Sequence, residues 1–333
     1  MREQLLRYIS CPKCGSHRFD LTKTRGEERN GREIREGTVT CTTCAQEFTV
    51  HNGILDLLPN PREDIMLERQ GWEDFIGDSE RSDEFVAALP RPPRGVTNQH
   101  GAELIRYWGP YADNFDQIFT NLQLKGDEKV LDVGAGRCWS TRNFARKGCY
   151  CVALDISAKK FIGLETADVY FKSDNVYFER VLGDLEALPF KDGTFDIIFA
   201  SAALHHSAQL ERVLEEISRC LSTDGRLAVC NEPCVGVLRK VMKHKKQNGE
   251  ENHHGINAHL YAFPEWVHGI ERAGLIPTFY FPQGATNRVV KGSKAQRFFN
   301  TTVYRSEGLL TLAQLSYGVS LATIAQKAPT QHN

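Results

Sequence analysis

The chain has 333 residues, of which 41% are apolar, and its formal net charge is −1. That length suits one large domain, or a medium domain with a small module, and the apolar fraction can furnish a sizeable core. The near-neutral charge lacks the basic excess that favours a nucleic-acid partner. No run of eighteen apolar residues indicates a membrane span, and the polar N-terminus is no signal peptide, so we expect a cytoplasmic protein.

Two Cys-x-x-Cys pairs stand near the N-terminus, Cys11 with Cys14 and Cys41 with Cys44. Two such turns can deliver four thiolates to one Zn²⁺, and a closed four-ligand set indicates structural rather than catalytic zinc. Unligated core cysteines or a redox pair are the alternatives. Residues 1–59 are therefore predicted to be a small zinc-ribbon β module that needs a metal to hold it together.

Residues 60–117 have a different composition. The segment begins with a highly charged stretch and contains the proline-rich sequence "ALPRPPRG". Tyr107, Trp108 and Tyr111 then recur at helix-like spacing. We expect a helical connector or lid here; a helix that only packs on the domain is the alternative.

From residue 118 to 333, strand-like and helix-like patterns alternate, which predicts an α/β fold. The expected architecture is a Rossmann-like, seven-stranded, mostly parallel sheet with helices on both faces. The last two strands are expected to form an edge hairpin. Insertions are expected near 235–262 and 284–317. The first helix after the glycine turn is expected to begin at Ser140 as its N-cap.

The stretch "VLDVGAGRCWS" carries Gly134 and Gly136 directly after a strand. A dinucleotide fingerprint would need a third glycine at 139, where Trp139 stands. A cofactor without a pyrophosphate would relax that demand. Asp155 follows Gly134 at the end of the next strand, where a carboxylate can accept hydrogen bonds from ribose hydroxyls.

The segment "GDLEALPFKDGTFDIIFASAALHHS" (183–207) resembles the class I S-adenosylmethionine-dependent methyltransferases, of the type 11-like group. The resemblance covers roughly 115–280, with a last strand near 317–327; Cys138 stands where the family has its third glycine. It implies direct displacement from S-adenosyl-L-methionine. The cofactor-binding residues that it implies are Asp132, Gly134, Ala135 and Gly136 at the methionine end, Asp155 and Ile156 at the ribose, Asp184 and Leu185 at the adenine, and Ser201 beside the methyl group.

His205 and His206 follow the expected fourth strand, close to the expected position of the reacting methyl. A histidine there is a candidate catalytic general base for the acceptor. The alternative is that one or both cap a helix or pack beneath the site. Many methyl transfers need no base, because positioning in a dry pocket suffices.

The sequence "LLRYISCPKCG" with "CTTCAQEFTVHNGILDLLP" resembles the small zinc-binding proteins that activate tRNA and release-factor methyltransferases. Similar ribbons are fused to other methyltransferases, including one that methylates ribosomal RNA, so the resemblance implies an RNA or protein partner for the module. The module nevertheless carries nearly equal numbers of basic and acidic residues. The basic run 239–246 is expected to be the solvated face of a helix, and a site that binds a phosphate group is the alternative. His253, His254, Asn257, His259 and Tyr261 are expected to form a substrate lid, with a second metal site as the alternative.

The sequence therefore predicts a methyltransferase that moves a methyl group to an O, N or C nucleophile of a small molecule. One alternative is an RNA methyltransferase that docks its substrate through the zinc ribbon. A second alternative is a non-catalytic partner protein that binds the cofactor.

Overall fold

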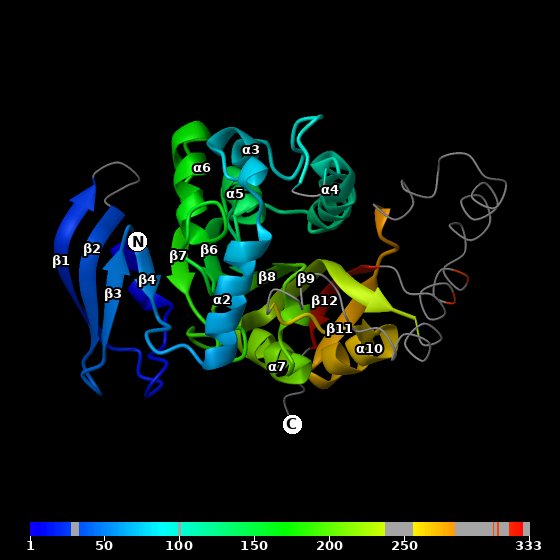
Figure 1. Cartoon of the computed structure of the whole chain (residues 1–333). Coiled ribbons are helices and arrows are strands. Elements are labelled where there is room, and N and C mark those ends of the chain that lie inside the picture. Colours follow the sequence, from blue (N-terminus) through cyan, green and yellow to red (C-terminus); the bar gives the residue numbers. More distant parts are fainter. Residues whose placement is uncertain are drawn as a thin grey trace, which may run out of the picture.

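The computed structural model describes residues 1–27, 33–98, 101–236, 256–283, 309, 312 and 320–328. In this part of the chain the strands form one sheet with the order β1-β2-β3-β4-β7-β6-β5-β8-β9-β12-β11, and the short β10 pairs with β9 (Figure 1). The strands are β1 Phe19–Glu27, β2 Glu33–Cys41, β3 Glu47–His51, β4 Ile54–Asp56, β5 Lys129–Val133, β6 Tyr150–Asp155, β7 Glu179–Leu182, β8 Phe195–Ser201, β9 Leu221–Val235, β10 Tyr261–Ala262, β11 Leu275–Phe279 and β12 Ser320–Lys327.

Seven of these strands, from β7 to β11 in the sheet order, form the predicted Rossmann-like sheet. The neighbours β7, β6, β5, β8 and β9 are parallel. β12 runs antiparallel to both β9 and β11, which confirms the expected edge hairpin. Parallel strands buried on both faces read as nearly continuous apolar runs, as the sequences of β5, β6 and β8 do.

Helices cover both faces of the sheet, as predicted (Figure 1). Successive side chains of a strand point to opposite faces, so Leu131 and Val133 join the core beneath α7 and α10, whereas Val130 joins the core beneath α3 to α6. The helices are α2 Glu63–Phe75, α3 Asp83–Ala88, α4 Leu104–Asn121, α5 Trp139–Arg146, α6 Ala167–Ser173, α7 Leu210–Cys220 and α10 Phe263–Arg272. No helix in the described residues is long and apolar enough to span a membrane.

The N-terminal strands continue the same sheet rather than forming a detached module (Figure 1). β4 pairs in parallel with β7, in a register that sets Leu55 opposite Val181. Side chains such as Phe48 and Val50 belong to the same apolar core as Phe190. The sequence did not indicate this continuity, because nothing in a short hairpin strand tells which sheet edge it will join.

The insertions fall largely outside the described residues. Residues 237–255 lie outside, and with them the basic run 239–246, His253 and His254. Most of the second expected insertion, 284–317, lies outside as well.

Candidate active site and metal centre

A cavity of about 1100 Å³ opens at the carboxyl ends of the parallel strands, between their loops and the connector helices α2 and α4. Ligand sites in open α/β sheets lie at this edge. The cavity brings together most of the predicted site residues: Gly134, Ala135, Gly136, Asp155, Ile156, Asp184, Leu185, Ser201, His205 and His206 all line it.

Gly134 sits at the tightest point of the glycine turn. Its φ is +66°, and a Cβ atom here would lie 2.4 Å from the Cβ of Ala203 in the turn after β8. Both the backbone conformation and the space therefore require glycine. Cys138 also has a positive φ, of 59°, which explains why glycine is the residue that suits this position best.

Helix α5 begins at Trp139, with Cys138 as its N-cap, so the prediction of Ser140 as N-cap is wrong. Ser140 instead lies in the first turn, where its hydroxyl donates to Asp132 at 2.6 Å. Trp139 lines the cavity, and its ring packs edge-on against Phe115 and Trp108 of α4, with centroids 4.9 Å and 6.2 Å away. The large side chain is accommodated because it fills the space between α5 and the connector.

Asp132 differs from the other predicted residues because it does not line the cavity. Its side chain is buried beneath the glycine turn, where it accepts hydrogen bonds from Ser140 and from Thr141, the latter at 2.5 Å. Burial raises the pKa of Asp132 to about 6. The structure thus places its carboxylate where it fixes the start of α5 rather than in the cavity itself.

Asp155 is held at the cavity wall by two backbone donors. The N–H groups of Gly136 and Ser157 donate to its two carboxylate oxygens, each at 2.8 Å. Burial raises the pKa of Asp155 to about 6. The carboxylate therefore lies directly beside the glycine turn, with its orientation set by main-chain atoms.

Asp184 has a partner that the sequence did not reveal. Arg62, at the start of α2, donates to Asp184 at 2.7 Å and to Glu186 at 3.1 Å. The N–H of Glu186 also donates to Asp184 at 2.9 Å. Burial raises the pKa of Asp184, while Arg62 opposes this shift. The connector helix thus closes over the loop that follows β7.

His205 and His206 lie side by side at the other end of the cavity, with ring centroids 4.0 Å apart. Nδ1 of His205 lies 2.8 Å from the carboxylate of Glu232 on β9. Nδ1 of His206 lies 2.5 Å from the carbonyl oxygen of Asn257 and 3.1 Å from the carboxylate of Glu68 on α2. Sequence reasoning missed both glutamates; the only available signal was the position of Glu232 near a strand end.

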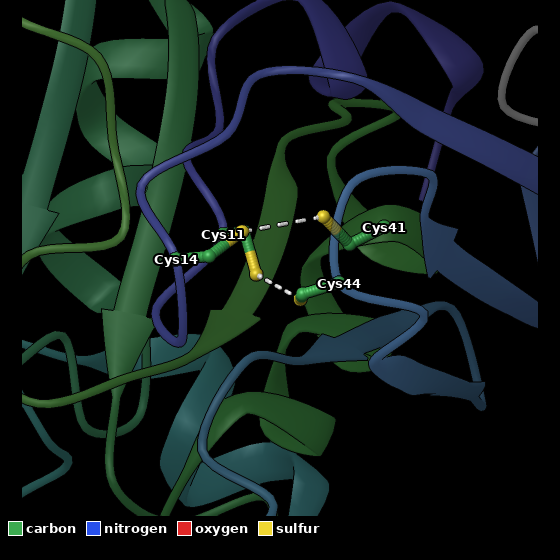
Figure 2. Close-up of side chains that lie close together, drawn as sticks. All are labelled: Cys11, Cys14, Cys41 and Cys44. Atoms are coloured by element: carbon green, nitrogen blue, oxygen red, sulfur yellow. Dashed lines mark hydrogen bonds between the residues drawn. The ribbon is translucent and has the colours of Figure 1, made fainter.

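The four cysteine sulfurs lie within 4.8 Å of one another, so within the described residues they form a group that could hold a metal ion. Figure 2 shows two sulfurs from each turn facing the other turn. Sγ of Cys11 is 3.7 Å from that of Cys44, and Sγ of Cys14 is 3.6 Å from that of Cys41. A tetrahedral zinc with Zn–S bonds of about 2.3 Å requires S···S distances of about 3.8 Å, so the site fits zinc.

Both cysteine turns have the same backbone form. The N–H of Gly15 donates to the carbonyl of Cys11 at 2.8 Å, and the N–H of Ala45 donates to that of Cys41 at 2.9 Å. Gly15 and Ala45 both have positive φ values. The two turns thus present their thiols as a matched pair, as a four-cysteine zinc site needs.

Residues 131–229 match the family model described as a methyltransferase domain. This part of the chain is similar to a methyltransferase domain. The chain is 36% identical over 124 residues to demethylmenaquinone methyltransferase of Mycolicibacterium gilvum, a match that covers 37% of this chain and 50% of that protein. It is 34% identical over 103 residues to malonyl-(acyl-carrier protein) O-methyltransferase of Erwinia billingiae, which covers 30% and 37%.

The chain thus spans half or less of the length of these curated relatives. Among solved structures, geranyl diphosphate C-methyltransferase of Streptomyces coelicolor is similar in fold, with a TM-score of 0.53 at 14% identity. That similarity covers 81% of this chain and 100% of the other. The match to the methyltransferase domain falls on the strands and loops that build the cavity, from β5 to β9.

Proposed function

We propose that this protein is an S-adenosyl-L-methionine-dependent methyltransferase that acts on a small molecule. The observation that carries the proposal is the single cavity that gathers the glycine turn, Asp155, Asp184 and the His205–His206 pair within a domain of methyltransferase type. Its volume of about 1100 Å³ exceeds what one ligand of ordinary size fills, which supports a cofactor and an acceptor together.

The residues fit this cofactor. The carboxylate of Asp155 would accept hydrogen bonds from the ribose hydroxyls, and Asp184 with Leu185 would hold the adenine. The backbone of the Gly134–Gly136 turn, which lines the cavity, would hold the methionine end. When bound, the cofactor supplies a methyl group that its sulfonium already activates. The protein's own residues then orient the acceptor and exclude water.

A small molecule is favoured over RNA as the acceptor. Residues of helices α2 and α4 form part of the cavity wall, which suits a ligand that enters whole better than a base within a folded RNA. The matched relatives are named as a demethylmenaquinone methyltransferase and a malonyl-(acyl-carrier protein) O-methyltransferase. The N-terminal module has no excess of basic residues that would bind phosphates. For the module we propose a structural zinc at Cys11, Cys14, Cys41 and Cys44, and a protein partner for its outer face stays a prediction.

Calorimetry with S-adenosylhomocysteine tests the cofactor assignment. The wild-type protein is expected to bind it with micromolar or tighter affinity, and Asp155→Ala is expected to abolish binding. Asp192→Ala removes an exposed carboxylate far from the cavity and should leave the affinity unchanged. A wild-type protein without measurable affinity, or an Asp155→Ala variant with wild-type affinity, would refute the assignment.

Transfer of labelled methyl groups tests the acceptor class. Cell extract is divided by size into a small-molecule fraction and a macromolecular fraction, and the second is treated with ribonuclease or left untreated. Label in the small-molecule fraction supports the proposal. Label that stays with macromolecules and disappears with ribonuclease would establish the RNA alternative. Cofactor binding with no transfer to any fraction would favour the non-catalytic protein.

A further inference from the structure

Glu232, near the end of β9, has a fully buried carboxylate that holds the turn after β8. Within the described residues, all of its hydrogen-bond donors belong to this turn: three are backbone N–H groups and the fourth is the ring of His205. The donors are the N–H groups of Ala203 at 2.7 Å, Leu204 at 3.0 Å and His205 at 3.1 Å, together with Nδ1 of His205 at 2.8 Å. A buried side chain so fully engaged fixes both the path of the turn and the direction of the His205 ring.

The charge of Glu232 decides the tautomer of His205. Burial raises the pKa of Glu232, but the His205 ring and the backbone N–H groups outweigh burial and hold that pKa below its ordinary value. An ionised carboxylate accepts hydrogen bonds and donates none, so Nδ1 of His205 must carry a hydrogen. The other nitrogen, Nε2, is then an acceptor. Within the described residues it has no hydrogen-bond partner, and His205 lines the cavity.

His206 has different surroundings although it is the next residue. Its Nδ1 contacts Glu68 of α2 and the carbonyl of Asn257, and its ring packs edge-on against Trp72. Burial lowers the pKa of His206, but Glu68, the carbonyl of Asn257 and Glu232 together raise it by more, so the net shift is upward. A ring with a raised pKa is protonated up to a higher pH, and a ring that already carries both protons cannot accept another. The two histidines are therefore not equivalent.

We infer that Glu232 is a positioning residue that makes His205 the general base of the site, and that the acceptor is a hydroxyl compound whose oxygen must lose a proton as it is methylated. This inference rests on the proposed function. It follows from the geometry: an imidazole that lines the cavity, with one nitrogen fixed by a buried carboxylate, can remove a proton through its other nitrogen. An acceptor already ionised at neutral pH, such as a carboxylate, would not need it.

The step balances as follows. The hydroxyl oxygen of the acceptor forms a bond to the methyl carbon, and the bond between that carbon and sulfur breaks with its electron pair moving to sulfur. The hydroxyl proton passes to Nε2 of His205, and the resulting imidazolium is stabilised by Glu232. The products are a methyl ether and S-adenosylhomocysteine, and the proton later leaves to solvent.

Glu232→Gln tests the positioning role with two readouts. The ¹⁵N shifts of the His205 ring are expected to report the Nδ1–H tautomer in the wild type and a mixture of tautomers in the variant. Methyl transfer to the small-molecule fraction is expected to fall about 10²-fold, while S-adenosylhomocysteine affinity stays within about twofold. Glu211→Gln, an exposed glutamate on α7, is the matched control. An unchanged tautomer or an unchanged rate in Glu232→Gln would overturn the inference.

His205→Gln tests the base while it leaves Glu232 and its backbone donors in place, so it covers the outcome in which Glu232→Gln does not fold. The wild-type rate is expected to rise with pH because only an unprotonated ring can accept a proton; the ionisable groups around the His205–His206 pair are Glu232, Glu68 and His259. His205→Gln should lose this rise and recover rate only at alkaline pH, where the acceptor hydroxyl ionises unaided.

Two results would contradict the assignment of the base. One is that His206→Gln, and not His205→Gln, removes the pH-dependent rise. The other is a His205→Gln rate within about threefold of the wild type, against the roughly 10²-fold loss expected for a general base. Failure of the wild type to bind S-adenosylhomocysteine would instead reject the proposed function, so the two failures are distinguishable.

Discussion

The two ends of the sheet reach stability by different means. The strands β5 to β9 are parallel, lie between two layers of helices and bury most of their side chains. The strands β1 to β3 form antiparallel hairpins at the sheet edge, with many half-exposed positions and the cysteine cluster at their base. A region that buries little apolar surface depends on a metal and on what it docks against, whereas a parallel sheet depends on its own core.

The boundary between the N-terminal strands and the parallel sheet, which we call the seam, lies where β4 pairs with β7. It contains charged as well as apolar side chains. Arg180 of β7 is fully buried and donates to Glu33 of β2 at 2.8 Å and to Asp168 at 2.9 Å. It also donates to the carbonyl of Asn52 at 2.8 Å. Strand β7 therefore supplies the nearest cation to Glu33, which also lies 3.5 Å from Arg35 and 3.9 Å from the N-terminal ammonium group.

Among the changes considered, removal of the metal site should lower stability the most. In Cys11→Ser/Cys41→Ser we expect the bound metal to be lost and the module to unfold, with a loss of more than about 5 kcal/mol in its unfolding free energy. Metal analysis should give one zinc per wild-type chain and none in the variant. Cys149→Ala, a buried cysteine outside the cluster, should keep the metal. A variant that folds and melts like the wild type would show that the module does not need zinc.

Breaking the charged seam should have the next largest effect. Arg180→Met removes the nearest of the cations around the buried Glu33, so we expect a loss of up to about 3–5 kcal/mol in unfolding free energy by denaturant titration. Arg180→Met/Glu33→Gln should recover part of that loss, because the buried charge is removed as well. Lys23→Met, which breaks an exposed pair in the same module, should change stability by less than about 1 kcal/mol. Equal effects of Arg180→Met and Lys23→Met would mean that the seam does not hold the two ends together.

Gly134→Ala changes the part of the sheet formed by β5 to β9 and leaves the N-terminal strands untouched. The added Cβ meets Ala203 at 2.4 Å in a left-handed turn, so we expect a loss of about 1–3 kcal/mol and at least tenfold weaker S-adenosylhomocysteine binding. Gly193→Ala is a matched control, because Gly193 has a φ of +64° and nothing within 4 Å of the added atom. The difference in unfolding free energy between the two variants measures the cost of the steric clash, and zinc content should be unchanged in both. No difference would show that the turn shifts to accommodate the added Cβ atom.

The smallest expected effect is the pH dependence of cofactor binding. In the proposed binding mode the ribose hydroxyls would donate to the ionised form of Asp155, whose pKa burial raises to about 6, so S-adenosylhomocysteine affinity should fall by up to about tenfold per pH unit below pH 6. Asp155→Asn should flatten this dependence. The stability of the unliganded protein should change with pH in the opposite direction. The pKa of Asp155 in the folded protein lies above its ordinary value of 3.8, so the contribution of Asp155 to stability grows as pH falls from 6 toward 4. Calorimetry and melting between pH 5 and 8 separate the two.

The cavity residues predicted from the sequence lie at or near strand ends. Gly134, Asp155 and Ser201 directly follow or close a strand, and Asp184 lies two residues after β7. The carboxyl ends of parallel strands meet at one edge of a sheet, so these residues come together. The four cysteines were predictable from spacing alone because their pattern is local and specific, whereas the cavity residues also needed the resemblance of 183–207 to a known family.

The remaining contacts depend on tertiary structure. Glu68 reaches His206 from α2, and Arg62 reaches Asp184 across 122 positions of chain. No periodicity in either segment indicates which loop the helix will cover. Asp132 was correctly placed on β5 but wrongly expected to line the cavity. Side chains alternate between the two faces of a strand, and Asp132 points to the face beneath α5 rather than into the cavity. This alternation distinguishes Asp132 from Asp155 and Asp184, which line the cavity.

The pairing of β4 with β7 has a consequence for how the protein assembles. Both strands belong to one chain, so each molecule carries its own edge strand at an effective concentration that dilution cannot lower. A shortened chain that starts after residue 59 would present β7 as an open edge, with unpaired N–H and C=O groups ready to join the sheet of another copy. The fused strand therefore protects each molecule from self-association from the moment it folds.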